Sequence, residues 1–139
     1  MYYLRKIAVI ICITIIGCTR EDDFPNIYVE ESIWITSPQY GHVYGNVWGW
    51  DTIPGGLGGI VFVQSTNNTF AAYDRACTFE TSQDCIISET ADNLILSCKE
   101  CCDSKFGIID GSVLEGSAAN QALKRYNTYF DGEYLYITN

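Results

Sequence analysis

Histidine and basic residues are scarce in this chain. Among 139 residues there is one histidine, His42, and 8 lysines and arginines stand against 17 aspartates and glutamates. There is no Ser/His/Asp arrangement, no phosphate-cradling glycine loop and no carboxylate pair at a useful spacing, so nothing indicates hydrolytic or transfer catalysis. The neighbours of His42 offer no second type of metal ligand. We therefore expect His42 to be an exposed loop residue rather than a ligand.

Apolar runs of membrane-spanning length are missing as well. The run from Ile7 to Ile16 has ten residues, about half of the ~20 that a transmembrane helix needs. Arg5 and Lys6 precede it, and the small residue Gly17 and then Cys18 follow. This order is typical of a secretory signal.

The residues Ile15-Ile16-Gly17-Cys18 resemble the lipobox of bacterial lipoproteins. The resemblance implies that residues 1–17 are a signal peptide, that Cys18 carries lipid, and that the protein is anchored in the outer membrane, facing the periplasm or the cell surface. Residues 18–28 are then an acidic, flexible tether, and residues 29–139 form the domain. A plain secretory signal with an incidental cysteine, or a short uncleaved anchor, are the alternatives.

Basic residues become scarcer still in the mature chain. Removal of residues 1–17 leaves 6 lysines and arginines against 17 acidic residues, a net charge of −11. Such a domain does not bind nucleic acid by neutralising phosphates. The mature compartment is oxidising, so cysteines without a ligand tend to pair there.

Long helical patterns are absent after residue 25, and short β-rich runs separated by turn residues take their place. Asp110-Gly111 and Asp131-Gly132 stand between such runs, and Asp-Gly is a strong hairpin signal. The Gly- and Trp-rich segment 40–59 is expected to be a covering loop or an edge strand. Trp34, Trp48 and Trp50 are expected to pack in the core and loops. The predicted strand segments are 32–37, 58–65, 69–76, 85–90 and 93–98, with the arms of the two Asp-Gly hairpins. Asn67-Asn68 is the predicted turn between 58–65 and 69–76, and "ADN" (91–93) is the predicted turn of a hairpin between 85–90 and 93–98. In the last strand, Leu135 and Ile137 are expected on one face and Tyr134, Tyr136 and Thr138 on the other. This spacing predicts an all-β sandwich or small barrel.

Five cysteines of the mature chain form two groups, one in "ACTFETSQDC" (76–85) and one in "SCKECCDSKF" (97–106). Both groups are predicted at hairpin ends that lie side by side. Two such loops can clamp one metal centre or be joined by a disulfide.

The motifs in this region resemble the Rieske domain, whose pattern is C-x-H, a spacer, C-x-x-H-G-S-x-F and then a D-G hairpin. Here "CTF" stands at the first motif, and "CCDSKFGIIDGSVLEG" (101–116) lies over the second motif and its hairpin. Residues 122–137 look like the closing hairpin of that fold. The resemblance covers nearly all of residues 25–139 and implies a Rieske-like domain with two Cys-bearing hairpin loops.

The departures from that pattern concern the ligands. A Rieske [2Fe–2S] centre has two cysteines on one iron and two histidines on the other. Phe79 occupies the first histidine position and cannot ligate iron. Cys102 occupies the second, and Lys99 stands where a cysteine ligand belongs unless one inserted residue brings Cys98 there. His42 lies in the wrong part of the chain to replace either histidine.

Three interpretations of the cysteines remain open. In the first, Cys77, Cys98, Cys101 and Cys102, or a set that uses Cys85, hold an all-thiolate [2Fe–2S] cluster. In the second, the same four residues hold Zn²⁺. In the third, no metal binds and disulfides join the two loops; the resemblance implies a bridge between Cys85 and Cys101. An odd number of cysteines then leaves one thiol free.

The sequence therefore supports two functions. The first is a membrane-anchored, Rieske-like lipoprotein of the iron–sulfur electron-transfer lineage, which passes an electron to an unidentified partner. The second is a cluster-free, disulfide-stapled structural or interaction module. In neither case is the protein expected to be an enzyme; at most it is an electron-transfer component of a redox system.

Overall fold

The computed structural model describes residues 24–89 and 94–139, and no α-helix occurs in them. These ranges contain one 3-10 helix, Pro38–Tyr40. No helix in them is long and apolar enough to cross a bilayer. The all-β fold class predicted from the sequence is confirmed. The strands are β1 Glu30–Ile33, β2 Trp50–Ile53, β3 Ile60–Thr66, β4 Thr69–Asp74, β5 Ser88–Glu89, β6 Ile95–Cys98, β7 Ser104–Gly107, β8 Arg125–Phe130 and β9 Leu135–Thr138.

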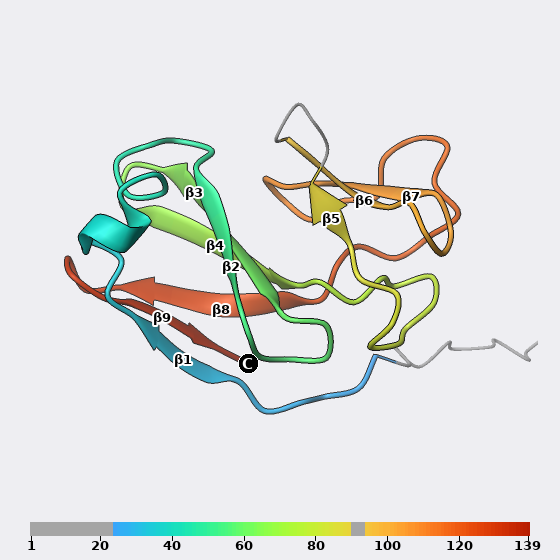
Figure 1. Cartoon of the computed structure of the whole chain (residues 1–139), viewed down its shortest axis with the longest axis horizontal. Helices are drawn as coiled ribbons and strands as arrows, with labels where there is room; N and C mark the ends of the chain where they lie inside the picture. The colour runs from blue at the N-terminus through green and yellow to red at the C-terminus, as the bar shows by residue number, and fades with distance from the viewer. Residues whose placement is uncertain (1–23, 90–93) are drawn as a thin grey trace, which may run out of the picture.

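Six strands form one antiparallel sheet in the order β1-β9-β8-β4-β3-β2 (Figure 1). Strands β3 and β4 lie in its interior, and each contains five consecutive buried residues. Continuous burial means that both faces of these strands are covered, which is why their sequences are runs of apolar residues rather than an alternating pattern. Strand β2 is an edge strand, as predicted for part of segment 40–59.

Turn chemistry fixes two of the hairpins as predicted. Asn68 adopts a left-handed conformation, with φ of 61°, at the turn between β3 and β4. Gly132 has a φ of 108° and lies between β8 and β9. In β9, Leu135 and Ile137 are buried while Tyr136 on the opposite face is partly exposed, which confirms the predicted alternation.

Three details of the prediction are wrong. Of the predicted strand 32–37, only the first two residues belong to β1, because the chain turns at Ser37, whose N–H donates to the carbonyl of Trp34. Trp34 is 51% exposed and therefore does not pack in the core. The Asp110-Gly111 turn forms, with a φ of 70° at Gly111, but its second arm makes only a single bridge, from Phe106 to Val113.

A second, three-stranded antiparallel sheet has the order β5-β6-β7 (Figure 1). It lies beyond one end of β3 and β4 in Figure 1. The pairing of β5 with β6 confirms the predicted hairpin, although its turn, residues 91–93, lies outside the described residues, as do the signal peptide and Cys18. One of the two apolar cores is shared by the two sheets, and it contains Cys77, Cys85 and Cys98.

Candidate metal centre

Four cysteines meet where the second sheet faces β3 and β4. Their sulfur atoms all lie within 4.8 Å of one another, and they belong to Cys77, Cys85, Cys98 and Cys102. The shortest separations join two pairs: Cys77 Sγ lies 3.1 Å from Cys102 Sγ, and Cys85 Sγ lies 3.0 Å from Cys98 Sγ. Each pair takes one sulfur from each cysteine group, so the two loops face each other as predicted.

Backbone hydrogen bonds hold each loop in shape. In the first loop the N–H of Cys77 donates to the carbonyl of Cys85 over 2.9 Å, which brings the two ends of the loop together. In the second loop the N–H of Cys102 donates to the carbonyl of Cys98 over 3.4 Å. Asp103 then adopts a left-handed φ of 53°, and the chain enters β7 with Ser104 opposite Cys98. The four sulfurs are thus positioned by short, closed loops.

Asp74 fastens the first loop to the rest of the domain. Its carboxylate is fully buried and accepts hydrogen bonds from the N–H groups of Leu57, Gly58 and Ala76, and from the hydroxyl of Tyr126. The bond from Ala76, over 2.8 Å, fixes the backbone immediately before Cys77. Buried carboxylates need such partners because removal of a charge from water is costly.

Burial and local hydrogen bonds set the acidity of the thiols. Burial raises the pKa of Cys77 and Cys85 above the ordinary value, and it raises the pKa of Cys98 to about 12. Burial also acts to raise the pKa of Cys102, but hydrogen bonds with Ser104, Cys77 and Cys98 outweigh it, and the pKa of Cys102 is lowered. Among the four thiols of the metal-free protein, Cys102 therefore loses its proton first as the pH rises.

Backbone N–H groups are directed at the sulfurs. Those of Phe79 and Glu80 act on Cys77, and that of Ser104 acts on Cys102. Each of these contacts lowers the pKa of the thiol that receives it, because a hydrogen bond to the charged form stabilises that form. The site therefore contains donors suited to thiolate ligands as well as the thiolates themselves.

The structure brings together three of the four cysteines named as ligands: Cys77, Cys98 and Cys102. Cys85 is the fourth member of the sulfur group, as in the alternative set that uses it. Cys101 is exposed and lies outside the group of four, although its sulfur is within 4.8 Å of donor atoms of Cys85 and Glu80. All five thiols are free, so the Cys85–Cys101 bridge stays a prediction.

The sequence held no signal for the choice between the adjacent residues Cys101 and Cys102. In β7, Ser104 and Phe106 are buried while Lys105 between them is exposed. That alternation does not extend back to Cys101 and Cys102, because these two residues lie in a turn and Asp103 has a left-handed φ of 53°. Phe79, at the first histidine position, is 57% exposed and contributes no ligand atom.

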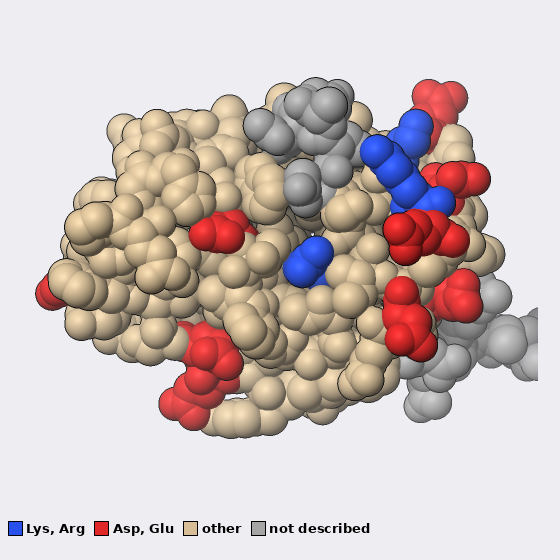
Figure 2. Space-filling model, in the orientation of Figure 1, with Lys and Arg blue, Asp and Glu red and all other residues tan. Residues whose placement is uncertain are grey.

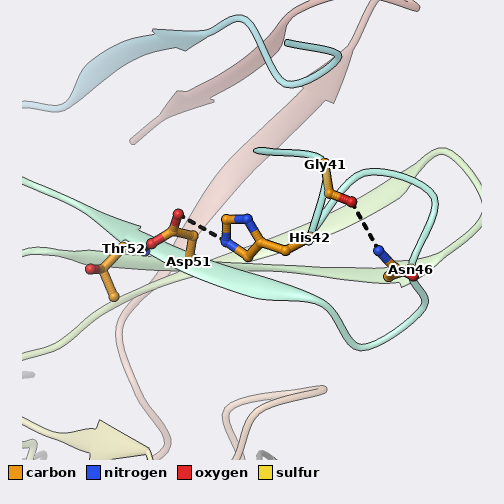
Figure 3. A network of polar contacts seen from close by, with 5 residues as sticks. All are labelled: Gly41, His42, Asn46, Asp51 and Thr52. Carbon is orange, nitrogen blue, oxygen red and sulfur yellow. Dashed lines mark hydrogen bonds and ion pairs between the residues drawn. The ribbon is translucent and has the colours of Figure 1, made fainter. Parts of the chain in front are cut away.

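His42 lies apart from the sulfur group, in the loop before β2. Its Nε2 atom is 3.1 Å from Oδ2 of Asp51, and its side chain is 55% exposed (Figure 3). In the same loop the side-chain amide of Asn46 donates to the carbonyl of Gly41 over 3.0 Å. His42 is therefore an exposed loop residue, as expected. Exposed ion pairs of this kind contribute little to stability.

Charged residues are unevenly spread over the face of the domain shown in Figure 2. Acidic side chains occur at several places, while the basic side chains on this face gather mainly near the end that carries β6 and β7, next to acidic ones. Much of the remaining surface on this face is uncharged. The basic side chains are thus interspersed with acidic ones rather than collected into a patch of their own on this face.

No protein-family profile and no curated protein matches the chain. Among solved structures, the chain is similar to the cyanobacterial plasma membrane Rieske protein PetC3 from Synechocystis PCC 6803. The two share 24% sequence identity and a TM-score of 0.49, and the match covers 59% of this chain and 78% of that chain. This similarity concerns the fold alone. No property of that protein's site is carried over to this chain.

Proposed function

We propose that this protein is a membrane-anchored, Rieske-like electron carrier whose four-cysteine centre binds iron. The observation that carries the proposal is the meeting of four sulfurs from two separate loops, all within 4.8 Å of one another. A tetrahedral set of four sulfurs selects zinc or iron. The resemblance of the motifs to an iron–sulfur domain favours iron.

Iron held by these thiolates would supply one-electron chemistry between its ferrous and ferric states. The chain's own contribution is to set the potential and limit access. Four thiolates place more negative charge on the metal than two thiolates and two imidazoles, which favours the oxidised form and predicts a potential below that of a histidine-ligated centre. The N–H groups that point at Cys77 and Cys102 partly offset this charge.

The membrane anchor is the second part of the proposal. Lipidation of Cys18 after removal of residues 1–17 would hold the domain at the outer membrane. The N–H of Val29 donates to the side chain of Asn139 over 3.1 Å, so the chain is already fixed to the domain at this point. The 11 residues from Cys18 to Val29 span at most about 36–40 Å when fully extended. Val29 therefore stays within that distance of the proposed lipid anchor.

The test separates metal from anchor. The full chain is produced in a bacterial host with a lipoprotein pathway, alongside a Cys18→Ser variant. We expect the parent in the membrane fraction and the variant in the soluble fraction, both coloured by thiolate-to-iron absorption and both reversibly bleached by dithionite. Colourless protein without iron would contradict the proposed electron carrier. Equal membrane retention of both proteins would contradict the proposed lipid anchor.

The two short sulfur–sulfur separations favour a second candidate, a disulfide-stapled structural or interaction module. Sulfurs at 3.0 and 3.1 Å need only a small approach to form the pairs Cys85–Cys98 and Cys77–Cys102. These pairs differ from the bridge between Cys85 and Cys101 that the resemblance implies, so peptide mapping under non-reducing conditions distinguishes them. For this candidate, thiol titration of the purified, metal-free protein leaves one reactive thiol per domain.

A further inference from the structure

We infer that the centre takes a single metal ion coordinated by Cys77, Cys85, Cys98 and Cys102, and not a two-iron cluster. The inference rests on the proposed function, since it specifies what the iron site holds. The spacing of the four sulfur atoms supports it.

One tetrahedral ion fits this spacing. With metal–sulfur bonds of about 2.3 Å, the four ligands of a regular tetrahedron lie about 3.8 Å apart. The sulfurs are at most 4.8 Å apart, and the two closest pairs are at 3.0 and 3.1 Å. The tetrahedron requires each close pair to open by about 0.7–0.8 Å and any wider separation to close by at most about 1.0 Å.

A two-iron cluster demands a wider arrangement. Its irons are bridged by two sulfides, so the two coordination tetrahedra share an edge and the cysteine pairs lie at opposite ends. With the same bond length of about 2.3 Å, each sulfur at one end is about 5.3 Å from one sulfur at the other end and about 6.5 Å from the second. No pair of sulfurs in the group of four exceeds 4.8 Å. The donor set therefore does not fit a [2Fe–2S] cluster.

The fold resists the widening that a two-iron cluster needs. Sulfurs at opposite ends of the cluster would have to move apart. The nearer separation would grow by at least about 0.5 Å and the farther one by at least about 1.7 Å. Cys77 and Cys85 are tied by their own backbone bond, and Cys98 and Cys102 by another. Cys77, Cys85 and Cys98 are also 0–1% exposed and packed within the apolar core that the two sheets share. Packed cores tolerate such displacements poorly.

The chain provides a matched pair of variants for the test. Cys102 belongs to the sulfur group and Cys101, its neighbour in sequence, does not. Full-length protein is purified without oxygen, and iron, zinc and acid-labile sulfide are measured per chain. The protein is then reduced, stripped of metal and titrated with Co²⁺, whose visible absorption reports tetrahedral thiolate binding. The titration is repeated with Cys102→Ser and Cys101→Ser, and circular dichroism checks that both variants are folded.

We expect one iron per chain without labile sulfide, and Co²⁺ saturation at one equivalent. Cys102→Ser should weaken Co²⁺ binding by more than about 100-fold, while Cys101→Ser should bind like the parent. Two irons with two sulfides per chain would overturn the single-ion inference and uphold the electron carrier. One zinc per chain would support the single-ion geometry and overturn the electron carrier. Equal losses in both variants would overturn the assigned ligand set, and the absence of any metal binding would overturn both proposals.

Discussion

The buried carboxylate of Asp74 offers a sharp test of how the first cysteine loop is held. We predict that Asp74→Asn, which preserves the shape of the side chain, strongly lowers the free energy of unfolding. The single oxygen of the amide can still accept from Gly58 and Ala76, which share Oδ1 in the parent. The amide nitrogen then faces the N–H of Leu57, which donates to Oδ2 over 2.7 Å in the parent. One partly buried donor, the N–H of Leu57, is left without an acceptor.

The magnitude follows from these contacts. An unsatisfied buried donor costs about 1–3 kcal/mol, and hydrogen bonds to a charged group contribute about 1.5–3 kcal/mol each. We therefore expect a loss of about 2–4 kcal/mol, a large part of the ~5–15 kcal/mol that stabilises an ordinary domain. Tyr126→Phe removes one hydroxyl donor from the same carboxylate and should cost about 1.5–3 kcal/mol. Urea unfolding of the reduced protein measures both, and the Asp74→Asn midpoint should fall by about 1–2 M.

Asp131 provides the control for burial. It also accepts two backbone N–H groups and a tyrosine hydroxyl, from Glu133, Tyr134 and Tyr136, but it lies on the exposed β8–β9 turn. Asp131→Asn should therefore shift the urea midpoint far less than Asp74→Asn. Equal shifts in the two variants would refute the reasoning, because they would show that the number of hydrogen bonds, rather than their burial, decides the cost.

The remaining predictions concern the glycine beside the first loop and the thiols themselves. A Cβ added at Gly58 would lie 2.5 Å from the backbone nitrogen of Ala76, so Gly58→Ala should lower the melting temperature by several degrees; Gly41→Ala, which meets nothing nearer than 3.5 Å, should not. Because burial raises the pKa of Cys98 from 9.0 to about 12, the unfolded chain loses this proton first, and the reduced, metal-free protein should lose stability between those pH values. A melting temperature that is flat from pH 8 to pH 11 would contradict this. Metal binding must displace the protons of the buried thiols. As the pH is lowered, Co²⁺ affinity should therefore fall by roughly tenfold per pH unit for each thiol that is still protonated. Calorimetry in two buffers of different ionisation enthalpy would count the released protons.

Local chemistry made much of the fold predictable. Asn68 and Gly132 provide the left-handed turn residues of two hairpins, and the alternation in β9 sorts inner from outer side chains. These signals extend over only a few residues and depend little on the rest of the chain. They fail where a strand is cut short by contacts from elsewhere: the predicted strand 32–37 ends after two residues at the turn that Ser37 closes.

The cysteine site shows the same division. The sequence identified two sulfur-bearing loops, the loss of the histidine at Phe79, and Cys77, Cys98 and Cys102 as candidate ligands. It also included Cys101, because motif spacing alone does not state which of two adjacent side chains points inward. The tertiary structure resolves this, because it places the sulfur of Cys102, and not that of Cys101, in the group of four.

The sequence by itself determined that the protein is a β-rich, acidic chain with two cysteine loops and no histidine pair for a Rieske centre. Tertiary structure decided which sulfurs meet and how closely. The two residues of each close pair are 25 and 13 positions apart in the sequence, so local sequence does not set the distance between them. Turn types and alternation are properties of neighbouring residues, whereas the distance between two loops is set by the packing of the sheets that carry them. The size of the metal centre is therefore a property of the fold.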